Sequence, residues 1–176
     1  MLKMFTTQLQ GLLNRIQDRE GMAMEDGARL LAQAAVGEGK IYMIGIQEMK
    51  AVETEALHGA EPLKGLYPFE GAEQIDHFTD ADRVLLISRF SHDQEALTIA
   101  KALADRGVPF VSIATEADSN DESIANLADV HIDLKLTKGL LPREDGQRFG
   151  FPSSMAALYV YFGLKFTLEE ILEEYE

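Results

Sequence analysis

Three groups that can take part in proton transfer lie close together in the sequence, at Glu55, His58 and Glu61. Glu55 and His58 are three residues apart, so both fall on one face of a helix, and Glu61 follows in the next connection. A carboxylate and an imidazole placed in this way can move a proton between two carbon atoms beside a carbonyl, as aldose–ketose isomerisation requires. Two alternatives stay open: a solvated surface pair on an acidic helix, and a metal site built from the same three side chains.

A second candidate site is the stretch SRFSHDQEAL, residues 88–97, which ends an apolar run and opens a helical one. Ser91 and Gln94 have the spacing of a capping box, which by itself explains the serine. A phosphate would gain at most about 2 kcal/mol from the helix end. The like charge of Asp93 at about 4 Å would repel it by roughly 4 kcal/mol at an effective dielectric constant near 20. The turn therefore predicts a polar ligand such as a sugar hydroxyl, with phosphate only where Arg89 turns inward.

A third candidate site is the connection between residues 137 and 154, which is long for a compact domain and therefore typical of a binding segment. It carries Arg143 and Arg148, and it leads to a helix start at Ser153 and Ser154 whose first amides are free. We expect an anionic group to bind here. The alternative is that the cations only neutralise neighbouring acidic side chains.

The elements that must position these groups follow from the spacing of apolar residues. Four runs of strand length are rich in β-branched and apolar residues: 40–46, 84–88, 108–114 and 129–134. Helical spacing is found in 1–22, 28–35, 47–60, 92–106 and from Ser153 onward. Residues 61–72 hold two Pro and two Gly, so they form a loop or at most an edge strand. This alternation predicts an α/β fold: a three-layer αβα sandwich, flavodoxin-like, around a parallel sheet of about five strands, with ligands bound at the carboxyl ends of the strands.

Composition limits the partners. The chain has 176 residues, 46% of them hydrophobic, so we expect one domain, residues 1–176. With 16 basic against 30 acidic residues and a net charge of -14, nucleic acid and membrane surfaces are not expected partners. No cysteine is present, which excludes disulfides, thiolate metal sites and a cysteine nucleophile. The opening segment is unlike a signal peptide and residues 149–164 are too short to span a bilayer, so a cytoplasmic protein is expected.

Two longer segments carry a family resemblance. The stretches VLLISRFSHDQEALTIAKALADRGVPFVSIA and SIANLADVHIDL, with the order of the elements, resemble the sugar isomerase (SIS) domain, and the pattern is most similar to phosphoheptose isomerases. Ser88, Gly107 and the pair Ala128-Asp129 match the family, and the resemblance covers residues 25–165. It implies a sugar phosphate or polyol as the ligand and no cofactor.

The functional motifs of that family are largely replaced. Only Gly45 remains of the first glycine-rich turn, and only Ser88 of the second. The resemblance places the family's catalytic Glu on Gly59 and its metal-binding His on Glu55, and the last helix offers no catalytic histidine. We therefore expect a divergent, non-catalytic or regulatory relative that binds a sugar phosphate. The alternatives are an active phosphoheptose-type isomerase whose base has moved within residues 55–61, and an oligomeric structural protein. The ligand-binding candidates are Gly45, Gln47, Glu48, Ser88, Arg89, Ser91, His92, Asp93, Arg143, Arg148, Ser153 and Ser154.

The terminal helices, 1–22 and 153–176, carry apolar stripes. SIS domains commonly pair through such helices, so the resemblance implies a homodimer or homotetramer. Thr167 and Glu170 have the spacing of another capping box, which predicts that a short acidic tail helix begins there.

Overall fold

A central parallel sheet organises the molecule. The computed structural model describes residues 1–116 and 122–175. The strands are β1 (Ile41–Gly45), β2 (Leu66–Tyr67), β3 (Arg83–Phe90), β4 (Phe110–Thr115) and β5 (Val130–Asp133). They lie in the order β2-β1-β3-β4-β5, and every neighbouring pair is parallel. The predicted α/β architecture is confirmed, and residues 61–72 supply the edge strand β2.

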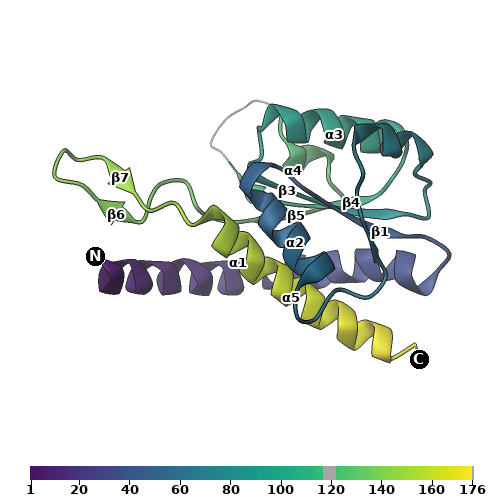
Figure 1. The fold of residues 1–176 in the computed structure, drawn as a ribbon, viewed down its shortest axis with the longest axis horizontal. Helices are drawn as coiled ribbons and strands as arrows, with labels where there is room; N and C mark the ends of the chain where they lie inside the picture. Colours follow the sequence, from purple (N-terminus) through teal and green to yellow (C-terminus); the bar gives the residue numbers. More distant parts are fainter. Residues whose placement is uncertain (117–121, 176) are drawn as a thin grey trace.

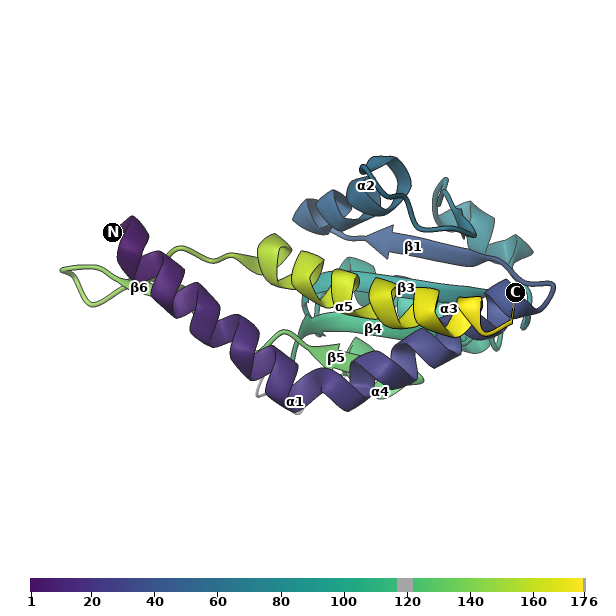
Figure 2. The same cartoon turned by 90° about the horizontal axis from the view of Figure 1, so that it is seen from below.

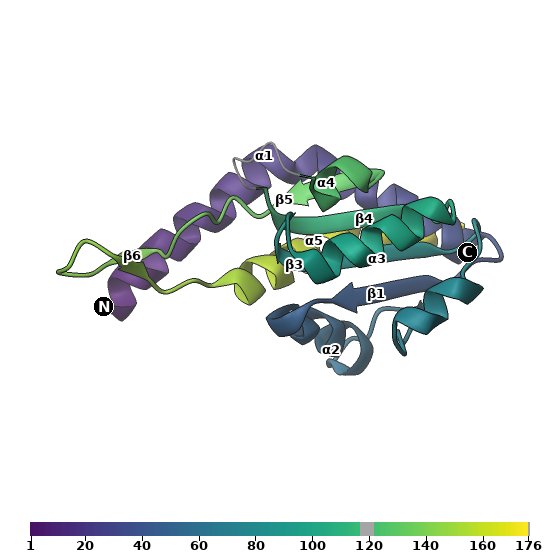
Figure 3. The same cartoon turned by 90° about the horizontal axis from the view of Figure 1, so that it is seen from above.

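Helices cover both faces of this sheet (Figure 1). One core lies between the sheet and α1 (Leu2–Val36), α2 (Lys50–His58) and α5 (Ser153–Glu173). The other lies between the sheet and α3 (Gln94–Asp105), α4 (Ile124–Leu127) and the 3-10 helix η2 (Ala72–His77). Figure 2 shows α1 and α5 across one face, and Figure 3 shows α3 across the other. Along β3, Leu85 and Ile87 belong to the first core and Val84 and Leu86 to the second, which is why the strand is apolar without alternation.

The first helix is longer than its sequence indicates. α1 is unbroken, so the expected helices 1–22 and 28–35 are one element and the prediction of two was wrong. A glycine inside a helix costs about 1 kcal/mol relative to alanine. A Cβ on Gly27 would lie 3.1 Å from Leu164 Cδ2 and 3.3 Å from Val111 Cγ1, so this glycine lets α1 pack closely on α5 and β4. Packing across the fold therefore offsets the low helix propensity of this stretch.

The last helix is also a single element. Thr167 lies inside α5, and its Oγ1 donates to the Gly163 carbonyl oxygen at 3.1 Å, one turn earlier. The predicted capping box of Thr167 and Glu170 was wrong, because Leu164 and Leu168 continue the buried stripe of α5 through this point. None of the helices in residues 1–116 and 122–175 is long and apolar enough to cross a membrane.

The connection 137–154 contains a hairpin, where the sequence predicted a loop. Its antiparallel strands are β6 (Leu141–Pro142) and β7 (Arg148–Phe149). The hairpin extends beyond the sheet beside the first turns of α1 (Figure 1), and a Cβ on Gly150 would lie 3.5 Å from the ring of Phe5. It leads directly into α5, which begins at Ser153 as predicted.

Candidate functional site

The carboxyl ends of β1 and β3 lie side by side. Gly45, the last residue of β1, pairs with Ile87 of β3, and Ser88 donates from Oγ to a carbonyl oxygen two residues on at 2.8 Å. The chain then turns into the 3-10 helix η1 (Gln47–Met49), where a Cβ on Gly45 would lie only 2.4 Å from the Met49 carbonyl oxygen. Glycine is therefore required at position 45, which explains why this residue of the glycine-rich turn is kept.

Gln47, in the same turn, has a left-handed backbone with φ of 51°. A side chain in this conformation costs roughly 1–2 kcal/mol, whereas glycine adopts it freely. The turn therefore has the backbone geometry of a glycine-rich loop although glutamine occupies the position. Strained residues of this kind are concentrated at binding and catalytic sites.

Glu48, Arg89 and Ser153 form a charged centre at this edge of the sheet. Arg89 donates from Nε to Oε1 of Glu48 at 2.6 Å and from Nη2 to Oε2 at 2.8 Å. The Ser153 hydroxyl donates to the same Oε1 at 2.8 Å. The hydrogen bonds from Arg89, followed by that from Ser153, lower the pKa of Glu48 to about 2 although partial burial opposes them. The carboxylate is therefore ionised at neutral pH, and it ties η1, β3 and α5 together.

A cavity of about 460 Å³ opens beside this centre. Its lining consists of Glu48, Arg89, Phe90, Phe151, Ser153 and Ser154. The rings of Phe90 and Phe151 meet edge-on with centroids 5.8 Å apart, and Phe90 stacks on His92 at 5.6 Å. An apolar wall with a few placed polar groups is the usual construction of a small-molecule site. The two phenylalanines were missed from the sequence, because an aromatic residue beside a polar motif carries no signal of its own.

The turn after β3 is arranged differently from the prediction. The N-cap of α3 is Asp93, whose carboxylate accepts a hydrogen bond from the Ala96 amide at 3.1 Å. Ser91 is buried, and Gln94 donates to the His92 carbonyl oxygen at 3.3 Å, so the predicted capping box of Ser91 and Gln94 was wrong. Aspartate caps a helix as well as serine does. The N-terminal end of α3 thus already holds a carboxylate of the chain itself, which disfavours phosphate at this point.

The two hairpin arginines have partners within the hairpin. Arg148 donates from Nε and Nη2 to two backbone carbonyl oxygens of its own connection, at 2.6 Å and 2.7 Å. The guanidinium of Arg143 lies 4.9 Å from the centre of the Phe149 ring. The arginine that lines the cavity beside Ser153 is Arg89 instead.

The three candidate catalytic side chains have different neighbours. His58 is the exposed last residue of α2, and Glu61, beyond the helix end, lies with Oε2 3.7 Å from the Lys165 ammonium. The Glu55 carboxylate lies over Gly59, where a Cβ would be 2.5 Å from its Oε1. Within residues 1–116 and 122–175, no group of three or more His, Cys, Asp or Glu side chains is arranged to hold a metal ion.

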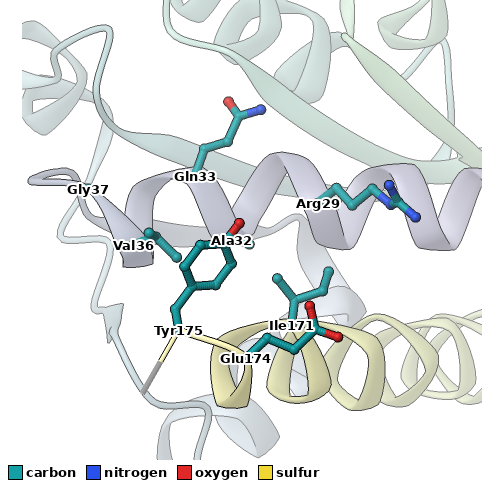
Figure 4. Close-up of a pocket in the computed structure, with 8 residues that line it drawn as sticks. All are labelled: Arg29, Ala32, Gln33, Val36, Gly37, Ile171, Glu174 and Tyr175. Carbon is teal, nitrogen blue, oxygen red and sulfur yellow. The ribbon is translucent and has the colours of Figure 1, made fainter.

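A second cavity, of about 620 Å³, lies between the C-terminal ends of α1 and α5 (Figure 4). Its lining consists of Arg29, Ala32, Gln33, Val36, Gly37, Ile171, Glu174 and Tyr175. Figure 4 shows the Tyr175 ring reaching toward α1 while the Gln33 amide points away from α5, and Gln33 accepts a hydrogen bond from Arg83 at 2.8 Å. Because α1 leads into the first residue of β1, this cavity lies at the amino end of the strands, opposite to the edge where ligands of such sheets bind.

The parallel sheet, its two helical layers and the cavity at the carboxyl ends of the strands define an α/β protein with the SIS fold, as the sequence resemblance implied. The chain belongs to the family described as "Domain of unknown function (DUF2529)", whose model matches residues 1–172. It is 47% identical over 176 residues to the protein YwjG of Bacillus subtilis (strain 168), with 99% of each chain covered.

Solved structures with the same fold are more distant in sequence. The protein c3406 of E. coli CFT073, in complex with arabinose-5-phosphate, has a TM-score of 0.69 and 17% identity, covering 98% of this chain and 89% of that chain. The Vibrio vulnificus NanR protein, complexed with ManNAc-6P, has a TM-score of 0.67 and 19% identity, covering 97% of this chain and 63% of that chain. The sugar isomerase domain of the RpiR transcription factor from Sphaerobacter thermophilus has a TM-score of 0.60 and 14% identity, covering 98% and 96%. At these identities the likeness establishes the fold.

Proposed function

We propose that this protein is a cytoplasmic SIS-type module that binds a sugar phosphate or related polyol without isomerising it. The observation that carries the proposal is the Glu48–Arg89–Ser153 centre beside the 460 Å³ cavity. Carboxylate and guanidinium groups form strong hydrogen bonds with hydroxyls, and Phe90 and Phe151 offer an apolar wall for a carbon chain. The arabinose phosphate and ManNAc-6P complexes of two proteins with the same fold support this class of ligand.

A phosphate group on the ligand would bind at the start of α5 rather than at α3. Asp93 already occupies the end of α3. Ser153 and Ser154 begin α5, a 21-residue helix without a side-chain cap, and Arg89 adjoins them across the cavity. Free end amides, hydroxyls and a guanidinium together suit an anion. Glu48 must then release Ser153 to make room.

The absence of turnover is proposed from the residues at the positions that the resemblance assigns to catalysis. Gly59 carries no carboxylate, His58 is exposed, and Glu61 is paired with Lys165. One observation favours the alternative, an active aldose–ketose isomerase: the Glu55 carboxylate lies over Gly59, close to where a side chain of residue 59 would begin.

Thermal unfolding with arabinose phosphate and ManNAc-6P tests the binding site. A ligand at about 100 times its Kd stabilises by about 2.7 kcal/mol, which raises the Tm of a chain of this size by roughly 5–10 °C. Arg89→Ala should abolish the shift, and Arg19→Ala, an exposed position on α1, should keep it. The proposal fails if neither sugar phosphate stabilises the protein or if Arg89→Ala responds like the wild type.

Solvent exchange separates the binding module from the isomerase. With arabinose phosphate in D₂O, a protein that only binds introduces no deuterium at the carbon beside the carbonyl, as measured by NMR. Deuterium incorporation that disappears in Glu55→Gln would support the isomerase instead.

We also propose a homodimer or homotetramer formed through α1 and α5. The apolar side chains exposed on these helices are Met1, Leu2, Met4, Met22, Met155 and Phe166, the first preceding α1 directly. Light scattering after size exclusion should give a multiple of 19.5 kDa. A monomer mass at every concentration tested would refute the assembly.

A further inference from the structure

Between α2 and α5 a tyrosine is buried away from the cavity described above. Tyr161 is 1% exposed, and its hydroxyl has no hydrogen-bond partner among residues 1–116 and 122–175. A buried hydroxyl without a partner costs free energy that phenylalanine at the same place would not. Packing alone therefore gives no reason for the hydroxyl.

Lys165 lies one turn further along α5 and is 3% exposed. Its ammonium is 3.1 Å from Oε1 of Glu169 and 3.7 Å from Oε2 of Glu61. An ammonium has three hydrogens to donate, and the contact to Glu61 is longer than a hydrogen bond. Lys165 thus keeps donor capacity for a further group.

The Glu55 carboxylate approaches the same region from α2. A Cβ on Gly59 would lie 2.5 Å from Oε1 of Glu55, so glycine at position 59 leaves the carboxylate its room. Burial, aided by the negative charges of Glu55 and Glu169, raises the pKa of Tyr161 to about 12. Tyr161 is therefore a hydrogen-bond donor at neutral pH, and Glu55 is an acceptor beside it.

We propose that the α2–α5 cluster, made of Glu55, Glu61, Tyr161, Lys165 and Glu169, is a second binding site and takes an unphosphorylated sugar or polyol. Tyr161 and Lys165 donate to the ligand and Glu55 accepts from it. Three carboxylates against one ammonium repel a phosphate, whereas paired donors and acceptors match hydroxyl and carbonyl groups. Glu61, 78% exposed, is the member at the surface where the ligand enters.

This site is separate from the Glu48–Arg89 cavity and does not depend on it. Ser153 and Tyr161 are eight residues apart on α5, about 12 Å along the helix axis. The two sites also differ in charge, because the cavity presents Arg89 and the start of a helix.

An NMR titration of the isotope-labelled full chain with D-arabinose tests the proposal. We expect amide shifts around residues 55–61 and 161–165. Tyr161→Phe should weaken D-arabinose binding at least tenfold and yet raise the Tm, because it removes a buried hydroxyl that lacks a partner. Tyr159→Phe is the matched control on the same helix: its hydroxyl meets Gln17 at 3.4 Å, and its loss should leave D-arabinose affinity unchanged.

Equal D-arabinose affinity in the wild type and in Tyr161→Phe would overturn the proposal, as would shifts confined to Glu48 and Arg89 or no binding at all. Arg89→Ala distinguishes the two sites, since it should abolish arabinose phosphate binding and leave D-arabinose binding intact. A wild type that binds D-arabinose but not arabinose phosphate would refute the proposed function and not this second site.

Discussion

Glu48 and Arg89 form a two-point ion pair that joins η1 to the end of β3, with Oε1–Nε and Oε2–Nη2 distances of 2.6 Å and 2.8 Å. Both carboxylate oxygens are used, and Ser153 at the start of α5 shares one of them. The pair therefore fixes three elements that line the cavity. An anionic ligand at Ser153 competes with this carboxylate for the same donors.

Glu48→Gln is expected to raise the affinity for arabinose phosphate several-fold while slightly lowering the Tm. The substitution removes the competing charge from Arg89 and Ser153, and a partly exposed ion pair contributes at most about 1 kcal/mol, or a Tm decrease of about 2–4 °C. Calorimetric titration and thermal unfolding measure the two effects. Arg89→Gln is the reciprocal control and should lower both affinity and Tm. Weaker arabinose phosphate binding by Glu48→Gln would contradict a phosphate position at the start of α5.

Asp93→Ala is expected to lower the free energy of unfolding by about 1 kcal/mol, because α3 loses its N-cap. Asp93→Ser keeps a cap and should stay close to the wild type in thermal unfolding. Since the serine variant also loses the negative charge, inorganic phosphate should stabilise it more than it stabilises the wild type. An alanine variant as stable as the wild type would show that the bond from the Ala96 amide contributes nothing.

The sheet is predictable from the sequence because its central strands are buried on both faces and so appear as uninterrupted apolar runs. The length of α1 is not predictable in the same way. Gly27 reads locally as a helix breaker, and only Leu164 and Val111, far along the chain, make it a packing position. Local propensity decides where no such partner exists, and distant contacts decide here.

The members of the charged centre are predictable, but their contacts are not. Glu48, Arg89 and Ser153 each follow from a motif position, whereas Glu48 is 41 residues from Arg89 and 105 from Ser153. The choice of cap at α3 depends on strand length in the same way. The Ser91 amide donates to the Thr115 carbonyl oxygen at 3.0 Å, so Ser91 still belongs to the sheet edge and the helix starts after Asp93.

His131, on β5, is held with one ring nitrogen beside Ser112 and the other without a partner. Nδ1 lies 2.7 Å from Ser112 Oγ, and Nε2 is buried with no hydrogen-bond partner in the described ranges 1–116 and 122–175. Burial lowers the pKa of His131 below its ordinary value of 6.5, against the opposing charges of Asp133, Glu116 and Glu20. A lowered pKa in the folded state means that the stabilisation is complete above pH 6.5 and is lost as the pH falls through the folded value.

The free energy of unfolding should therefore decrease between about pH 7.5 and about pH 5.5, above the range in which most carboxylates titrate. His131→Gln should remove this part of the pH dependence, as measured by chemical denaturation at each pH. His58→Gln, at an exposed position, should keep it. Parallel pH profiles for the wild type and His131→Gln would contradict the assignment.

Gln47→Gly is expected to leave the Tm unchanged or slightly higher. Relief of the left-handed backbone gains roughly 1–2 kcal/mol, and the added freedom of glycine in the unfolded chain offsets about 0.4–1 kcal/mol of it. The same substitution at Gln10, exposed inside α1, should instead cost about 0.5–1 kcal/mol, because glycine there only weakens a helix. Gln47→Val should be the least stable of the three, since a branched side chain fits this backbone worst. If Gln47→Gly destabilises as much as Gln10→Gly does, the turn after β1 carries no strain, and its likeness to a glycine-rich loop is lost.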